Sequence, residues 1–96
     1  MDKTERMLLE NVLNALDRLF DHETQVCDLC DLLIATSAAL SNSDHTAKLE
    51  EAASETDTLR RSSLSREKQR DQALVETDEL RKYLSDVLYK DSPLKI

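Results

Sequence analysis

Residues 3–21 alternate between apolar and polar positions with the period of an α-helix. Apolar side chains recur at spacings of three and four, and asparagine, aspartate and arginine fill most positions between them. This spacing places the apolar side chains on one face of a helix of about five turns. Asp2 and Glu5 stand in the order of a helix N-terminal cap. The pattern predicts a helix over residues 3–21, with an apolar stripe of Leu9, Val12, Leu13, Leu16, Leu19 and Phe20.

Residues 24–40 carry a broader apolar surface than the first helix. Their apolar side chains, most of them leucine, alanine or cysteine, cover more than half of the helix circumference. A helix with so wide an apolar surface is buried on several sides or meets a second protein. We predict that this second helix ends before residues 41–44, because their serine, asparagine and aspartate side chains compete with helical hydrogen bonds.

Two further helices follow this break. Residues 44–61 show a weak stripe of small apolar side chains, with Ser43 or Asp44 as the expected N-cap. The serine-rich stretch 62–65 then predicts a second turn. A fourth helix is expected over residues 66–90, where apolar side chains again recur with helical spacing.

One continuous helix is the alternative interpretation of residues 44–90. If Leu49 occupies heptad position a, the a and d positions continue through the serine-rich stretch without interruption. Such a helix of about 45 residues would be roughly 68 Å long. Because the first two helices are much shorter, only dimerisation would cover it. The sequence therefore leaves two architectures open: four helices, or a helical hairpin plus one long helix that dimerises.

The composition supports a helical fold and argues against several classes of binding and catalytic site. The 96 residues include no glycine, and the single proline is Pro93. Glycine and proline permit sharp turns and a close approach to phosphates, so their scarcity argues against P-loops, dinucleotide-binding folds and nucleophile elbows. Aromatic residues make up only 3% of the chain, so the core must be built mainly from leucine, valine, isoleucine and alanine. We predict a single all-α domain over residues 1–96, a small antiparallel helical bundle.

Charge is distributed unevenly along the chain. The formal net charge is −7, yet residues 1–59 hold 13 acidic and 4 basic side chains, a net charge of −9. Residues 60–70 hold 5 basic and 1 acidic side chain, a net charge of +4. The acidic half argues against direct nucleic-acid binding, which needs clustered Lys and Arg, and favours a basic protein partner. The basic stretch is expected to pair with this protein's own acidic helices, within the chain or across a dimer.

The motif Cys27-Asp28-Leu29-Cys30 is the clearest candidate for chemistry. A redox-active CxxC pair lies at a helix N-terminus, whereas this pair falls inside the predicted second helix, among apolar residues. A structural zinc ion needs four ligands, and His22 and His45 lie beside different loops. We interpret the two cysteines as small buried apolar side chains and predict no metal and no cofactor. A metal- or redox-sensing regulator is the third functional hypothesis.

Nothing in the sequence indicates catalysis. No serine has a paired histidine and aspartate in a recognisable arrangement. Paired carboxylates such as Glu50 and Glu51 occupy positions expected on solvated helix faces, and neighbours in sequence do not share a face. We therefore predict a protein without enzymatic activity.

The functional hypothesis is a small bacterial, cytoplasmic interaction protein that does not associate with membranes. Its leading form is an acidic inhibitor of the immunity or antitoxin kind, which neutralises a basic toxin such as a nuclease. Carboxylates on a rigid helical surface imitate phosphates and accelerate association. The alternative is a homodimeric helical adaptor or secretion chaperone that works through the broad apolar second helix. The predicted partner-binding residues are Glu10, Asp17, Asp21, Asp28 and Asp31, with Leu19 and Phe20 as apolar anchors.

Overall fold

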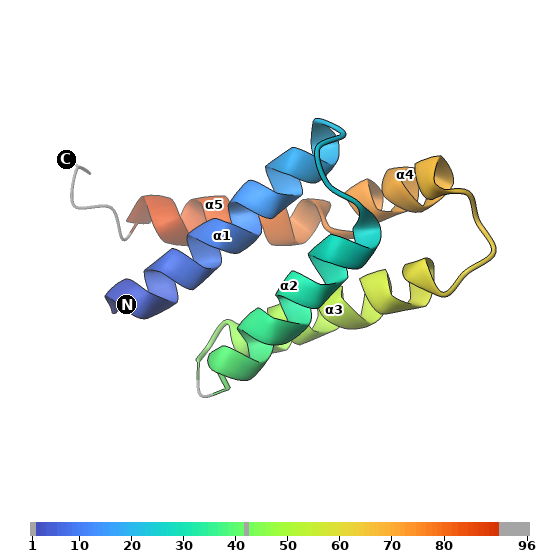
Figure 1. Ribbon diagram of the computed structural model, residues 1–96. Coiled ribbons are helices and arrows are strands. Elements are labelled where there is room, and N and C mark those ends of the chain that lie inside the picture. The colour runs from blue at the N-terminus through green and yellow to red at the C-terminus, as the bar shows by residue number, and fades with distance from the viewer. Residues whose placement is uncertain (1, 42, 91–96) are drawn as a thin grey trace.

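The computed structural model of this chain describes residues 2–41 and 43–90, which form five α-helices and, within those ranges, no strand (Figure 1). The helices are α1 (Lys3–Phe20), α2 (Val26–Ala39), α3 (Thr46–Arg60), α4 (Arg66–Glu76) and α5 (Asp78–Lys90). This arrangement confirms the prediction of an all-α fold. Within the described ranges, no helix has the length and apolar character needed to cross a membrane.

Polar side chains fix the first turns of α1 and α4. The Asp2 carboxylate accepts a hydrogen bond from the Glu5 N–H at 2.7 Å, which confirms the predicted cap of the first helix. The Glu5 carboxylate accepts a hydrogen bond from the Ser43 hydroxyl, and so joins α1 to the α2–α3 connection. Ser65 caps α4 by accepting a hydrogen bond from the Lys68 N–H at 3.3 Å.

The third helix begins later than the sequence suggested. Its N-cap is His45, not Ser43 or Asp44, and the His45 side chain does not cap the helix. The Ser43 hydroxyl accepts a hydrogen bond from the His45 N–H at 3.1 Å and donates one to Glu5. Ser43 therefore stabilises the turn before the helix and the contact with α1, instead of the first turn of α3.

The chain leaves helical geometry between Arg60 and Arg66, so the interpretation of residues 44–90 as one continuous helix is wrong. The Ser62 hydroxyl donates a hydrogen bond to the Leu59 carbonyl at 2.6 Å and accepts one from the Leu64 N–H at 3.4 Å. These bonds satisfy backbone groups outside a helix, which is how serine favours turns. The serine-rich stretch acts as the break that the four-helix interpretation required.

A second interruption, at Thr77, was not expected. The predicted helix over residues 66–90 is two helices, α4 and α5, so the expected number of four is wrong. The Thr77 hydroxyl donates a hydrogen bond to the Ala73 carbonyl at 2.7 Å, a bond that bends helices. Asp78 and Glu79 then form an acidic first turn of α5, which suits the positive end of a new helix.

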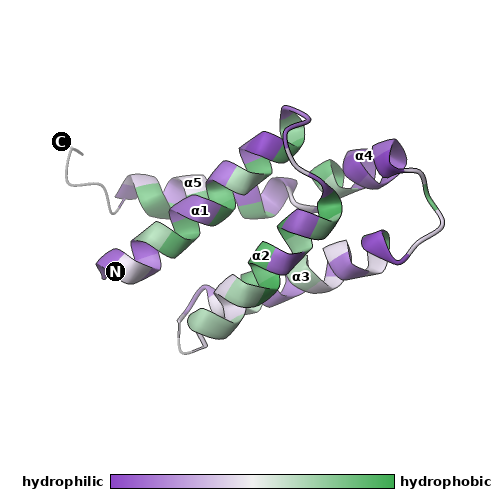
Figure 2. Ribbon diagram, in the orientation of Figure 1, coloured by the Kyte–Doolittle hydropathy of each residue, from purple (hydrophilic) through white to green (hydrophobic). Residues whose placement is uncertain are grey.

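The helices surround one aliphatic core. The second helix packs along α3, the first packs against α2 and α5, and α4 contacts α1, α2 and α3. Figure 2 shows hydrophobic positions along the inner faces of these helices, while the first turns of α4 are hydrophilic. The buried side chains of this core are mainly aliphatic, as predicted, and the half-buried Tyr83 packs against them. The buried leucines are Leu9, Leu16, Leu19, Leu29, Leu33, Leu49, Leu59, Leu80, Leu84 and Leu88.

The end of α1 is held by a side chain from α4. His22 follows the helix with a φ of 63°, in the left-handed region. The Arg70 guanidinium donates hydrogen bonds to the Leu19 carbonyl at 2.9 Å and to the Phe20 carbonyl at 2.6 Å. These carbonyls lie in the last turn of α1, where cations are favoured by the helix dipole. Arg70 thus fixes the position of the α1–α2 connection relative to α4.

Candidate functional site

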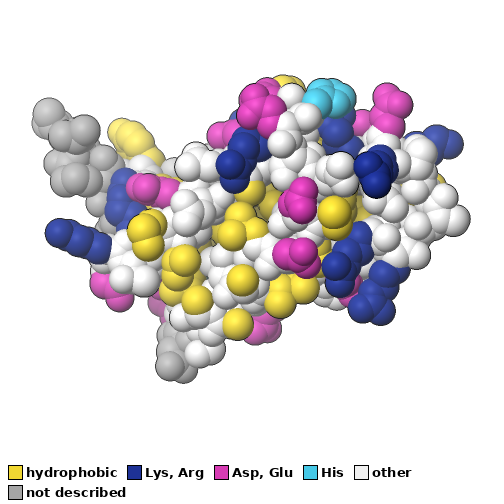
Figure 3. Space-filling view, viewed as in Figure 1, with side chains coloured by type: hydrophobic (Ala, Val, Ile, Leu, Met, Phe, Trp, Pro, Cys, Tyr) yellow, Lys and Arg dark blue, Asp and Glu magenta, His cyan; other side chains and the backbone are white. Residues whose placement is uncertain are grey.

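The outward face of α2 is apolar over its second half. Ile34 is 45% exposed, and Ala35, Ala38 and Ala39 are exposed beside it, while Leu33 on the opposite face is fully buried. No charged residue occurs in this half of the helix. In Figure 3 hydrophobic side chains gather over α1 and α2, with acidic groups at the edge of the cluster. We name the exposed residues Ile34, Ala35, Ala38 and Ala39 the α2 strip.

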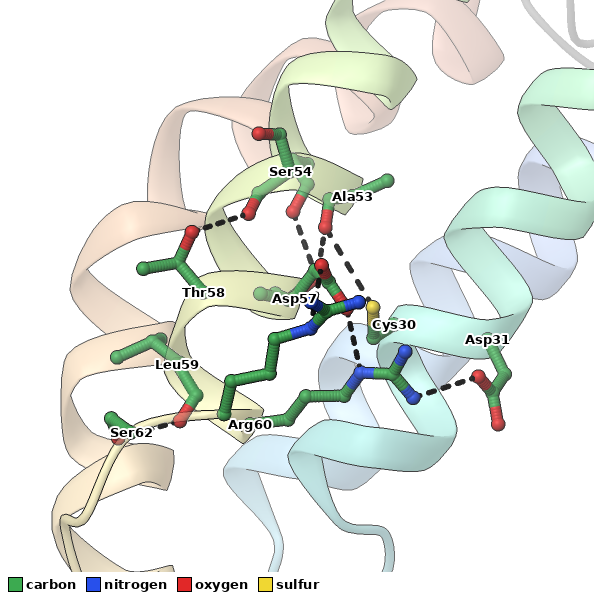
Figure 4. A network of polar contacts seen from close by, with 12 residues as sticks. Cys30, Asp31, Ala53, Ser54, Asp57, Thr58, Leu59, Arg60 and Ser62 are labelled. Carbon is green, nitrogen blue, oxygen red and sulfur yellow. Dashed lines mark hydrogen bonds and ion pairs between the residues drawn. The ribbon is translucent and has the colours of Figure 1, made fainter.

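Two of the predicted carboxylates lie on α2 ahead of this strip. Asp28 and Asp31 are both exposed, and their spacing of three places them on one side of the helix. The Arg60 guanidinium lies between α2 and α3, with Nη1 3.5 Å from Asp31 and Nε 2.7 Å from Asp57 (Figure 4). The hydrogen bond from Arg60 lowers the pKa of the Asp57 carboxyl. Because the Asp31 side chain is 69% exposed, it remains accessible to a partner.

The other predicted carboxylates lie on α1 and do not share that surface. The Asp17 carboxylate is 3.0 Å from Nε of Arg81, which turns it toward α5. Glu10 pairs within its own helix with Arg6 at 2.9 Å. Asp21 is exposed and forms the C-cap of α1. The structure therefore places the five predicted carboxylates in separate positions, and only those of α2 adjoin the α2 strip.

The two predicted apolar anchors differ in exposure. Leu19 is fully buried in the core, so its assignment as a partner-binding anchor is wrong. Its place on the inner stripe of α1 explains the burial. Phe20, the next residue, is 59% exposed and remains available.

The two cysteines also differ. Cys30 is buried, and its Sγ lies 3.7 Å from the Ala53 carbonyl oxygen of α3. Cys27 is exposed, so the interpretation of both cysteines as buried side chains is wrong for this one. The reason is the position at which α2 begins. Its first residue is Val26, which places Cys27 in the first turn instead of inside the helix.

The two histidines lie at opposite ends of α2. His22 belongs to the connection before that helix, and His45 precedes α3 after it. The His45 ring hydrogen-bonds to the Tyr83 hydroxyl and packs edge-on against the Tyr83 ring, with centroids 5.6 Å apart. The zinc set considered above is therefore not assembled. Within residues 2–41 and 43–90, no group of three or more His, Cys, Asp or Glu side chains could hold a metal ion.

Part of the basic stretch pairs with acidic side chains of the same chain. Arg60 and Arg61 both contact Asp57, with the Arg61 Nε at 3.2 Å. Arg70 contacts Asp71 at 3.2 Å in addition to the carbonyls of α1. These pairs agree with the expectation that the stretch neutralises the chain's own carboxylates. Arg66, by contrast, has no ion-pair partner among the described residues.

A cleft of about 640 Å³ lies where the α1–α2 connection faces the end of α3 and the beginning of α4. Sequence reasoning missed it, because its walls come from two segments, residues 22–27 and 60–70, that lie far apart in the chain. The charge reversal over residues 60–70 was the one indication in the sequence. The lining residues are His22, Thr24, Gln25, Val26, Cys27, Arg60, Arg66, Glu67, Gln69 and Arg70.

Comparisons with protein-family models, with curated proteins and with solved structures find no match for this chain.

Proposed function

We propose that this chain is a small antiparallel helical bundle that acts as a non-enzymatic module for protein binding. The observation that carries the proposal is the α2 strip, where Ile34 is 45% exposed among exposed alanines. A surface of small side chains with one larger apolar residue suits the close approach of another protein surface. Exposed apolar area with a polar border is typical of interaction sites.

The charges around this strip favour a basic partner. Asp28 and Asp31 stand next to it on α2, and residues 1–59 as a whole carry a net charge of −9. Charge complementarity of this kind accelerates association and selects among partners more than it adds to affinity. We therefore assign the occupant of the α2 strip as a protein with a cationic surface.

In its specific form, the proposal is an inhibitor of the immunity or antitoxin kind that covers the cationic site of a bacterial toxin such as a nuclease. Phe20, 59% exposed at the end of α1, is a further apolar contact in this proposal. The carboxylates of α2 take the place of substrate phosphates. The rigid helix that presents them reduces the entropic cost of binding.

The test begins with the product of the gene next to this one in its genome, purified and also expressed alone in cells. We expect that product to be toxic alone and harmless when this chain is co-expressed. The association rate of the two proteins should fall at least tenfold between about 50 and about 500 mM salt, because salt screens charges over these distances. A complex whose rate is unchanged by salt would contradict electrostatic attraction, and a harmless neighbour without affinity would contradict the inhibitor form.

A substitution in the α2 strip tests whether this strip is the surface that binds the partner. Ile34→Asp should weaken the complex by about tenfold or more, because it replaces the larger apolar contact of the strip with a carboxylate that must lose its water in the interface. Val75→Asp is the matched control, since Val75 is 71% exposed on α4. Circular dichroism establishes that both variants fold. Equal affinities for the two variants would exclude the α2 strip.

The alternative is a homodimeric adaptor or secretion chaperone in which the α2 strip meets a second copy. The same exposed alanines favour it, because small residues allow two helices to pack closely. Light scattering distinguishes the two functions. The inhibitor requires a monomer that forms a complex with its target, whereas the adaptor requires a stable dimer that Ile34→Asp dissociates and Val75→Asp leaves intact.

A further inference from the structure

We propose that the cleft between the α1–α2 connection and the α3–α4 region binds a small phosphorylated molecule. Its volume of about 640 Å³ lies within the range of about 300–1,000 Å³ that is usual for ligand sites. Three arginines, Arg60, Arg66 and Arg70, line it together with one carboxylate, Glu67. In a chain with a net charge of −7, this concentration of guanidinium groups around one cavity distinguishes it from the rest of the surface.

Two of these guanidinium groups are held in place by the fold. Arg70 is fixed by its hydrogen bonds to the Leu19 and Phe20 carbonyls, at 2.9 and 2.6 Å, and by its 3.2 Å contact with Asp71. Arg60 is fixed by its 2.7 Å bond to Asp57 and its 3.5 Å contact with Asp31. A guanidinium has five N–H donors, so each retains donors beyond these contacts. Side chains that are already ordered lose less entropy when a ligand arrives.

Arg66 supplies the charge that the protein itself does not use. It lines the cleft at the first position of α4 and has no ion-pair partner in the part of the chain that the structure describes. Arginine binds phosphate oxygens through two parallel hydrogen bonds. We assign Arg66 as the principal ligand of the phosphoryl group, with Arg60 beside it.

The backbone adds to this preference for an anion. Val26 and Cys27, in the first turn of α2, line the cleft. The N-cap residue, Gln25, makes no side-chain hydrogen bond to this turn. The backbone N–H groups of the turn are therefore available to a ligand. This contribution is secondary to the arginines, because Asp28 stands close by on the same helix.

The size of the cleft indicates that the ligand is more than a phosphate ion. A phosphoryl group occupies a small part of about 640 Å³. His22, Gln25 and Gln69 offer hydrogen bonds to a polar body, and Val26 offers an apolar contact. A phosphorylated metabolite fits this lining, and the group shared by all such ligands is the phosphate dianion.

The experiment is a titration of the full chain followed by backbone NMR at pH 7.5 and constant ionic strength. Inorganic phosphate, phosphoserine and adenosine monophosphate are the three probes, and sodium chloride is the reference salt. We expect saturable shifts at residues 26, 27, 66 and 67 with all three probes. The organic phosphates should bind more tightly than phosphate alone if their bodies also contact the cleft.

Three variants assign the residues. Arg66→Gln should weaken phosphoserine binding by about tenfold or more, and Glu67→Gln should strengthen it several-fold by removing the one lining carboxylate. Lys68→Gln removes the same charge as Arg66→Gln from the same helix, at a position outside the cleft, and should change affinity less than twofold.

Linear shifts without saturation, or shifts of equal size in sodium chloride, would overturn the proposal. Equal weakening by Arg66→Gln and Lys68→Gln would do the same, because it would indicate attraction to net charge alone. Binding of inorganic phosphate without any gain for the organic probes would overturn the assignment of a phosphorylated metabolite.

Discussion

His22 occupies a backbone position that most proteins give to glycine. Its N–H donates to the Leu19 carbonyl at 3.3 Å, and the Glu23 N–H donates to the Arg18 carbonyl at 2.8 Å. This pair of bonds is the Schellman motif, whose C′ residue adopts left-handed geometry. Histidine at a φ of 63° carries the steric cost that a Cβ brings there. The absence of glycine thus did not remove the need for this geometry.

We expect His22→Gly to stabilise the protein by about 0.5–1 kcal/mol. The gain is the relief of left-handed strain, about 1–2 kcal/mol, reduced by the greater freedom of glycine in the unfolded chain, about 0.4–1 kcal/mol. Urea denaturation measures the change. Glu23→Gly is the control, because the residue is exposed and its φ is not positive, and it should destabilise or leave stability unchanged. Stabilisation by both substitutions would exclude strain at His22.

At this scale the sequence indicated some roles well and others not at all. Asp2 was identified as a cap because its partner lies three residues away. Leu19 was assigned to a binding surface, although it belongs to the buried apolar stripe of α1. The helical spacing of apolar residues therefore predicted its burial better than its assignment as a surface anchor did. Arg70 gave no indication of its role, since the carbonyls that it contacts lie 51 and 50 residues earlier.

At the scale of elements, α4 depends on its cap more than the other helices do. It is 11 residues long, its only fully buried side chain is Ala73, and its first turns are hydrophilic. Short helices gain most of their stability from packing, and here little packing is present. The hydrogen bond from the Lys68 N–H to the Ser65 hydroxyl therefore helps to stabilise the first turn of α4, which lines the cleft.

We expect Ser65→Ala to cost about 1 kcal/mol of unfolding free energy, the usual value for a lost N-cap. Urea denaturation again provides the measurement, and amide hydrogen exchange should show faster exchange confined to the first turn of α4. Ser63→Ala, at an exposed position in the same connection, should change stability by less than about 0.5 kcal/mol. A similar cost at both positions would contradict a specific cap.

The division between α4 and α5 marks the limit of prediction from periodicity. Thr77 keeps the helical bond from its N–H to the Ala73 carbonyl at 2.9 Å, so the apolar spacing continues through the junction. Only the order Thr77-Asp78-Glu79, a capping residue followed by two acids, signalled a new helix. The stretch 62–65 was easier to interpret because three of its four residues are serines, which compete with helical hydrogen bonds.

At the scale of the whole molecule, a group of carboxylates faces the seam between α3 and the last two helices. Glu51 and Glu55 of α3 lie with Glu76 and Glu79 around a small cavity that Lys48 also lines. Burial raises the pKa of the Glu55 carboxyl, and the nearby charges of Glu76, Glu51 and Glu79 raise it further. The ionised form of Glu55 is therefore less favourable in the folded protein than in the unfolded chain.

The consequence for stability has a definite sign. The pKa of Glu55 is raised in the folded protein, so protonation of Glu55 stabilises the fold. This contribution to the free energy of unfolding is complete below the ordinary glutamate pKa of about 4.3. It is lost as the pH rises through the folded-state pKa. Glu55→Gln should leave stability unchanged near pH 4 and increase it at pH 7. Thermal unfolding across this pH range measures the difference.

Glu50→Gln is the control for Glu55→Gln. It removes the same charge from an exposed position on the same helix, so it reports the effect of net charge alone. If the stabilities of the two variants change identically at every pH, repulsion in the seam between α3 and the last two helices is not the cause of the change.

The contact between α1 and α5 sets the order in which the fold can assemble. The second and third helices are neighbours in sequence and pack along each other, so their encounter closes only a short loop. The hydrogen bond from Arg6 to the Leu88 carbonyl, 3.3 Å long, joins residues 82 positions apart. Closing so long a loop costs more chain entropy, and contacts of this range slow folding. In kinetic terms, the docking of α1 on α5 is the step on which the refolding rate should depend most, after the α2–α3 pair has formed.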